Sequence, residues 1–213
     1  MTGPDASTAS IPARVAAIRD AVEAVPGVRR VALTGSRAID DPTPLSDWDF
    51  DVDISDASVL DALEDSLRPL PVLALFWDPL SKRANLIALV DGPIKVDVIV
   101  PDARNPQAIA GWTVTAEALP RIDEHFWDWT LWLAAKHLRG DTQLVEVQLQ
   151  RMWNALLEPL GATEPPTTIS DAIESYAEAS QRRAREHGVT LDPGLGRQVV
   201  AALVEHGVIA RHR

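Results

Sequence analysis

The fold of this chain is decided by Leu33-Thr34-Gly35-Ser36-Arg37 and, about ten residues later, by Ser46-Asp47-Trp48-Asp49-Phe50. Apolar residues precede the Gly-Ser pair, which predicts a strand over residues 28–34 that ends in a tight turn. Asp47 and Asp49 open a second strand, and residues two apart on a strand project from the same face. Two carboxylates at such a short distance repel each other, and a shared divalent cation usually offsets that repulsion. The turn offers backbone N–H groups and a hydroxyl to phosphate oxygens, so the stretch predicts a site for a metal-bound nucleoside triphosphate.

The second strand, over residues 49–54, alternates acidic with apolar residues. This alternation predicts a sheet with one apolar face and one acidic face. A metal site needs only the first two acids, so Asp51 and Asp53 are expected to face solvent. Trp48, which stands between those two acids, is expected to pack on the other face of the sheet.

A third acid, Asp97, interrupts the apolar strand Lys95-Val96-Asp97-Val98-Ile99-Val100. An unpaired carboxylate in a buried strand is costly, so Asp97 is expected to have a partner. If this strand lies beside the strand that carries Asp49, three carboxylates surround one or two Mg²⁺ ions. Such a site suits an in-line displacement at phosphorus.

Hydrophobic periodicity and turn residues predict the remaining elements. In the first half we expect helices over 11–25 and 58–67 and strands over 72–77, 85–90 and 95–100, the last two joined by a hairpin at Asp91-Gly92. In the second half we expect helices over 123–139, 141–157, 170–187 and 195–204, the second of them capped by Asp141. This order predicts an α+β fold. An N-terminal domain of residues 1–105, with a mixed β-sheet flanked by helices, is followed by a C-terminal helical domain of residues 106–213.

The composition of the 213 residues excludes several classes of protein. The formal net charge of -11 has the wrong sign for a protein that coats nucleic acid, so nucleic acid is not expected as a partner and a cationic substrate is favoured. The chain has no cysteine, which excludes a disulfide scaffold, a thiolate metal site and a cysteine nucleophile. The N-terminus lacks a signal-peptide pattern, and no apolar run approaches the ~20 residues that span a bilayer. A cytoplasmic protein without a membrane partner is therefore expected.

The motif spacing resembles the polymerase-beta-type nucleotidyltransferase superfamily. The residues that carry the resemblance are Gly35-Ser36, then Ser46-Asp47-Trp48-Asp49, then the lone acid on a later strand. Within that superfamily, a short N-terminal domain followed by helices is most similar to the aminoglycoside adenylyltransferases. Family members often continue the Gly-Ser-Arg turn with another Arg-Gly pair, and Ile39-Asp40-Asp41 stands there instead.

The resemblance implies that the chain uses Mg²⁺ and a nucleoside triphosphate, with ATP as the first candidate. It implies a triphosphate-binding turn made by Gly35, Ser36 and Arg37. It also implies a catalytic metal site made by Asp47 and Asp49, with Asp97 as a third ligand, a general base, or both.

Two cations, Lys136 and Arg139, lie about one turn apart near the end of the expected helix 123–139. They could reach across a cleft to the triphosphate, which makes them candidate nucleotide-binding residues. They could equally follow the preference of cations for a helix C-terminus. The sequence leaves both readings open.

The same helix is rich in tryptophan and acidic residues. Trp127, Trp129 and Trp132 could stack on an adenine or a sugar, but packing in a core is favoured because three indoles cannot all face one cleft. Nearby acids, Asp128 among them, could attract an amine-rich substrate or form an ordinary solvated face. The five histidines show no ligand spacing and are expected to be surface or packing residues.

The leading hypothesis is Mg²⁺-dependent transfer of AMP, or another nucleoside monophosphate, to a hydroxyl of a small molecule. An aminoglycoside-type antibiotic is the best single guess for that acceptor. One alternative is an antitoxin-like minimal nucleotidyltransferase that binds or adenylylates a protein partner. Another is a nucleotide-binding module that has lost turnover. A template-directed polymerase is disfavoured by the acidic charge balance.

Overall fold

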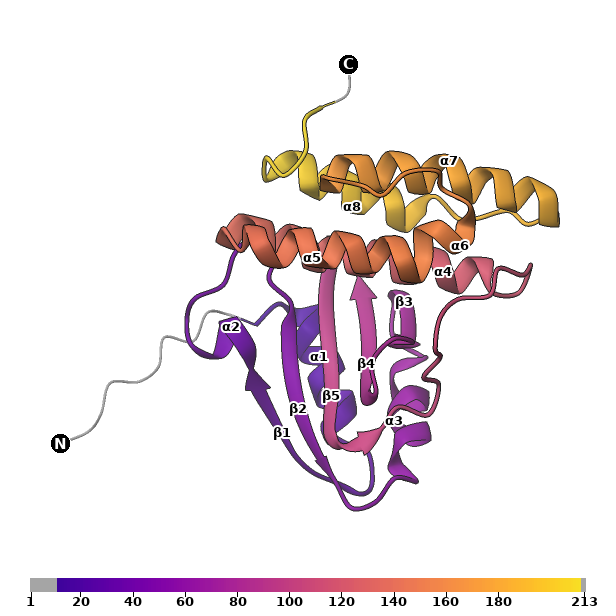
Figure 1. The fold of residues 1–213 in the computed structure, drawn as a ribbon. Coiled ribbons are helices and arrows are strands. Elements are labelled where there is room, and N and C mark those ends of the chain that lie inside the picture. The colour runs from indigo at the N-terminus through magenta and orange to yellow at the C-terminus, as the bar shows by residue number, and fades with distance from the viewer. Residues whose placement is uncertain (1–10, 212–213) are drawn as a thin grey trace.

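The strands of the first half form one mixed β-sheet in a computed structural model that describes residues 11–211 (Figure 1). The sheet has five strands in the order β1-β2-β5-β4-β3. Strands β2 and β5 are parallel, and the other neighbouring pairs are antiparallel. The strands are β1 Val28–Thr34, β2 Trp48–Ile54, β3 Val72–Trp77, β4 Arg83–Val90 and β5 Ile94–Arg104. The predicted α+β class and mixed sheet are therefore confirmed.

The predicted hairpin joins β4 and β5, with Val90 paired to Ile94 across the Asp91-Gly92 turn. Both strands run further than the apolar pattern indicated, because Arg83 pairs with Arg104 beyond a register irregularity. Pro101 falls within that irregular stretch of β5. A proline has no N–H to give to a ladder, and such irregularities are where sheets accommodate it.

One face of the sheet packs against two helices, α1 Ala13–Glu23 and α3 Val59–Leu67. Trp48, Phe50 and Val52 of β2 are buried in this core, while the acids between them are not part of it. The predicted division of β2 into an apolar and an acidic face is confirmed, as is the packing of Trp48.

The helical half packs on the opposite face, over β3 and β4. Phe76 and Leu89 share one hydrophobic core with Phe126 and Leu133 of α4. Figure 1 shows α7 and α8 stacked on the side of α4 that faces away from the sheet, and both contact α4. The main helices of this half are α4 Leu119–Arg139, α5 Thr142–Met152, α7 Ile169–His187 and α8 Gly194–Glu205. Because this core joins both halves, the division into domains at 105/106 stays a prediction.

The helix predicted over 141–157 is not uniform. It begins as α5 and widens into a π-helical segment, η1 Trp153–Leu157, before the short α6 Glu158–Leu160. Pro159 lies in α6 and cannot donate a backbone hydrogen bond, and the backbone N–H of Glu158 bonds the carbonyl of Trp153. Asp141 is at the N-cap of α5, but its side chain makes no capping hydrogen bond.

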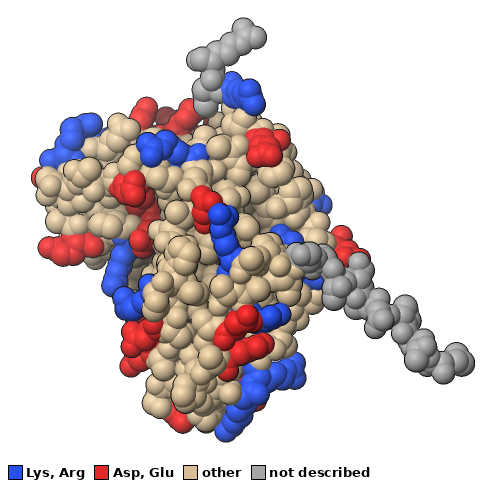
Figure 2. Space-filling model, turned by 180° about the vertical axis from the view of Figure 1, so that it is seen from behind, with Lys and Arg blue, Asp and Glu red and all other residues tan. Residues whose placement is uncertain are grey.

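Basic and acidic side chains are interspersed among the described residues on the face that Figure 2 shows. Among residues 11–211, no helix combines the length and the apolar character that a membrane crossing requires.

Candidate active site

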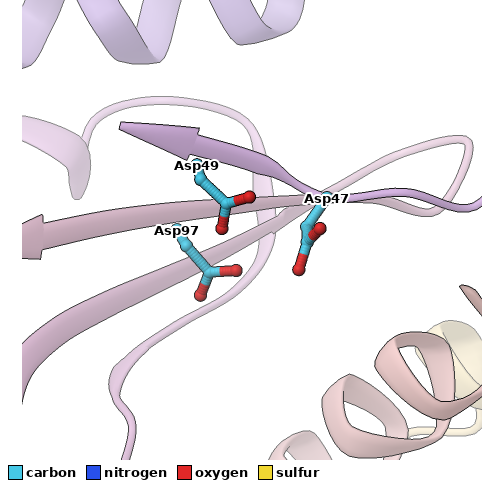
Figure 3. A group of neighbouring side chains, drawn as sticks. All are labelled: Asp47, Asp49 and Asp97. Carbon is cyan, nitrogen blue, oxygen red and sulfur yellow. The ribbon is translucent and has the colours of Figure 1, made fainter. Parts of the chain in front are cut away.

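The sheet topology brings the three predicted aspartates together. In the parallel pair β2–β5, Asp49 is directly opposite Asp97. Asp47 precedes β2 by one residue, and its carboxylate points toward the other two (Figure 3). One carboxylate oxygen from each residue lies within 4.8 Å of the others. The three acids therefore form one cluster, and their catalytic role stays a prediction.

The later acids of β2 do not join this cluster. Asp53 is exposed and lies 3.6 Å from the guanidinium of Arg29. Asp51 lines a separate surface hollow together with Arg30. Both findings agree with the expectation that only the first acids of the strand belong to the site.

The electrostatics of the cluster favour a cation. Burial, followed by repulsion from Asp47 and Asp97, raises the pKa of Asp49 to about 7. Burial also raises the pKa of Asp97, although Lys95 opposes that rise. Carboxylate oxygens are the ligands that Mg²⁺ prefers in proteins. The chemistry and spacing of these donors therefore fit a divalent cation.

Asp97 has the partners that a buried carboxylate requires. Its Oδ1 accepts a hydrogen bond of 2.9 Å from Nδ2 of Asn85 and lies 3.3 Å from Nζ of Lys95. The same ammonium group donates to Asp128 of α4. Asp128 is only 4% exposed, so its reading as part of a solvated helical face is wrong. The reason is tertiary: α4 lies over the sheet, and its acid faces a lysine of β5.

Gly35 begins the short helix α2 Gly35–Ala38, directly after β1. Its φ of +66° is in the left-handed region, and a Cβ atom there would lie 2.1 Å from Oδ2 of Asp49. Glycine is therefore needed at this position for the carboxylate of Asp49 to lie where it does. The carbonyl of Ser36 accepts a hydrogen bond from the backbone N–H of Asp41. The predicted role of Gly35 and Ser36 in binding a triphosphate stays a prediction.

Arg37 braces the loop before β2. Its guanidinium donates to the backbone carbonyls of Ser46 and Asp47 at 2.6 to 3.1 Å, and it lies 4.3 Å above the ring of Trp48. Burial lowers the pKa of Arg37. These contacts give Arg37 a structural task that the motif did not indicate: it holds the backbone that carries Asp47. Its contact with a nucleotide stays a prediction.

The two cations near the end of α4 differ in position. Nζ of Lys136 lies 5.1 Å from the ring centre of Trp132, and its charge lowers the pKa of Asp49, although burial and the neighbouring acids outweigh it. Arg139 is exposed and donates to the backbone carbonyl of Asp41, 3.1 Å away. Lys136 is therefore within electrostatic reach of the acid cluster, while Arg139 ties the helix end to the loop that follows α2.

A cleft of about 400 Å³ opens beside the cluster, between the sheet and the helices α4 and α5. This volume is in the range of small-molecule sites. The lining residues are Asp47, Asp49, Asp78, Leu80, Ser81, Asn85, Lys95, Asp97, Ile99, His125, Asp128, Trp129, Trp132, Gln148 and Arg151.

Several of these residues carried no functional signal in the sequence. Asp78 comes from the β3–β4 loop and Arg151 from α5, so only packing brings them to β2. Buried His125 stacks on Trp129, which agrees with a packing histidine. Burial lowers the pKa of His125 to about 4, although Asp78 opposes that shift, so the ring is neutral at pH 7.

The tryptophans divide between core and cleft. Trp127 lies in the core of the helical half, where its Nε1 donates to Asp123. Trp129 and Trp132 line the cleft. The favoured core packing is confirmed for Trp127. Trp129 belongs to the same core but also lines the cleft, as does Trp132, so for these two the alternative of stacking on a ligand stays open.

No protein-family model matches the sequence, and no curated protein matches it. Among solved structures, one match is an aminoglycoside 6-adenyltransferase from Bacillus subtilis. The match covers 91% of this chain and 97% of that chain, with 9% sequence identity and a TM-score of 0.31. A likeness that low supports no conclusion about this protein.

Proposed function

We propose that this chain is a nucleotidyltransferase that transfers AMP, or another nucleoside monophosphate, from a nucleoside triphosphate to a hydroxyl of a small molecule. The observation that carries the proposal is the convergence of Asp47, Asp49 and Asp97 beside the cleft. The resemblance of the Gly-Ser turn and the Asp-x-Asp pair to polymerase-beta-type nucleotidyltransferases supports the same reaction.

Asp47, Asp49 and Asp97 would hold Mg²⁺. When bound, the ion would supply charge neutralisation and polarisation at the phosphate. The raised pKa of Asp49 supports this assignment, because a cluster that disfavours its own ionisation gains most from a cation.

The chain's own residues would orient two substrates and accept a proton. The acceptor oxygen attacks the α-phosphorus, the bond from that phosphorus to the bridging oxygen breaks, and pyrophosphate leaves. The proton of the hydroxyl passes to a carboxylate of the cleft. Trp129 and Trp132 would give flat apolar walls to a base or a sugar ring. Arg151 and Gln148 of α5, which face the same cleft, would donate to phosphate oxygens.

An aminoglycoside-type acceptor remains the best single guess. Asp78 adds a further carboxylate to the cleft, and the formal net charge of the chain is -11. Both features attract a polyamine with ring hydroxyls more than an anionic acceptor.

The proposal is tested with purified protein, Mg²⁺, ATP labelled at the α-phosphate, and panels of aminoglycosides, other hydroxylated metabolites and candidate proteins. Pyrophosphate release with a labelled small molecule supports the proposed function. Labelled protein would instead support the adenylylation of a partner. Nucleotide binding without transfer across all panels would contradict the proposal and indicate a module that has lost turnover.

A matched pair of variants ties the activity to the cluster. Asp49→Asn should lower turnover by at least about 100-fold, because it removes one of the three carboxylates that would hold Mg²⁺. Asp53→Asn removes the same charge from the exposed end of the same strand and should leave turnover unchanged. Equal turnover of the two variants would refute the placement of the site.

A further inference from the structure

We propose that Asn85, Lys95 and Asp128 form a positioning network that fixes the carboxylate of Asp97 and leaves one of its oxygens free to bind the metal. The inference rests on the proposed function, since it assigns Asp97 to the metal site. It adds three residues that no motif indicated, one of which comes from the helical half of the chain.

The two donors to Asp97 bind the same oxygen. Nδ2 of Asn85 lies 2.9 Å from Oδ1, and Nζ of Lys95 lies 3.3 Å from Oδ1. Within residues 11–211, no side-chain hydrogen bond or ion pair engages Oδ2 of Asp97. The network therefore restrains the carboxylate through one oxygen and leaves the other available to a cation.

The amide of Asn85 has one orientation that makes chemical sense. Its Nδ2 faces Asp97, and its buried Oδ1 has no hydrogen-bond partner in the described part of the chain. The reverse orientation would place two acceptor oxygens against each other. A buried acceptor without a partner is costly, so the amide is a poor choice for packing alone. The contact that it does make is with Asp97.

The lysine lies between two carboxylates. Lys95 is 7% exposed, and its ammonium group contacts Asp97 on one side and Asp128 of α4 on the other. Asp128 binds the lysine without joining the metal cluster. Asp128 balances the positive charge of the buried ammonium group. Lys95 can therefore hold Asp97 while the three carboxylates of the metal cluster keep their net negative charge. Residues that hold a metal ligand in this way typically affect metal affinity by about 10- to 100-fold.

The test measures Mn²⁺ binding by electron paramagnetic resonance, with no nucleotide present, and follows urea unfolding of the same variants. Asn85→Leu removes one donor. The double variant Lys95→Met/Asp128→Leu removes one positive and one negative charge together, so the net charge around Asp97 is unchanged. Replacing a buried ion pair in this way is often neutral for stability. The control double variant Arg14→Met/Asp91→Leu removes an exposed ion pair of 3.0 Å.

We expect Asn85→Leu and the buried-pair variant each to weaken Mn²⁺ binding by about tenfold or more, with unfolding midpoints close to that of the wild type. The control pair should bind Mn²⁺ like the wild type. Activity measurements should then show a raised half-saturating Mg²⁺ concentration, with turnover recovered in part at high Mg²⁺.

Three outcomes would overturn the inference. If Asp49→Asn abolishes Mn²⁺ binding while both network variants bind within twofold of the wild type, the network does not position Asp97 and the proposed function stands. If both network variants lose affinity only in proportion to unfolded protein, the residues are merely structural. If the wild type itself binds no Mn²⁺, the metal site of the proposed function fails together with this inference.

Discussion

Gly35→Ala is the substitution whose effect follows most directly from the geometry of the site. The new Cβ atom would lie 2.1 Å from Oδ2 of Asp49. Ordinary contacts to carbon need about 3.5 Å, so the carboxylate must move by more than about 1 Å. A displacement of that size at a reacting centre can lower the rate by about 100-fold. The left-handed backbone, with φ of +66°, adds a cost of about 1–2 kcal/mol for any residue with a Cβ atom.

The assay separates these two effects. Mn²⁺ binding and nucleotidyl transfer report the displaced carboxylate, and urea unfolding reports the backbone cost. Gly140→Ala is the matched control, because Gly140 has φ of +86° and its Cβ would meet no atom within 4 Å. Both variants should be destabilised, and only Gly35→Ala should lose metal affinity. Wild-type Mn²⁺ affinity in Gly35→Ala would refute the reasoning that this glycine makes room for Asp49.

Three further predictions concern stability. Arg37→Ala removes the donors to the carbonyls before β2 and should lower the free energy of unfolding by about 2–3 kcal/mol in urea titrations, whereas an unchanged value would contradict the bracing role. Burial, and then Asp123, raises the pKa of Glu124 from 4.5 to about 7, so the folded state binds this proton more tightly than the unfolded chain does. Stability should therefore fall as pH rises from about 4.5 to 7, and Glu124→Gln should reduce that fall by about 1–2 kcal/mol in unfolding titrations at pH 5 and pH 8. Gly196→Ala would place a Cβ atom 2.6 Å from Cζ2 of Trp127, and it should lower the midpoint of thermal unfolding by an amount equivalent to about 1–3 kcal/mol despite the better helix propensity of alanine.

Local patterns predicted the strands well because each strand carries its own signal. The alternation in β2 identified which side chains enter the core, and Asp91-Gly92 marked the hairpin between β4 and β5. The sequence predicted that Asp49 and Asp97 would meet only if their two strands were neighbours in the sheet. In the structure β2 and β5 are neighbours, and Asp49 lies opposite Asp97.

The partners of Asp97 could not be predicted from local sequence patterns. A buried carboxylate implied some partner, but nothing in the sequence indicated that Lys95 would be shared with Asp128, which is 33 residues away along the chain. The sequence left Asp128 either to attract an amine-rich substrate or to lie on a solvated face, because a helical pattern identifies which residues share a face and not what lies against it. The tertiary structure likewise brings Asp78 of the β3–β4 loop and Arg151 of α5 to the cleft.

The sequence by itself determined the α+β class, the main elements and the three acids of the cluster, because periodicity and short motifs act over a few residues. Only the tertiary structure decided what surrounds those acids. In the tertiary structure the carboxylate of Asp49 lies against Gly35, and Arg37 donates to the backbone carbonyl of Asp47. There, Asp128 of α4 also contacts Lys95 of β5. These contacts join segments that are distant in the chain, and their energy depends on burial and distance, which no local pattern contains.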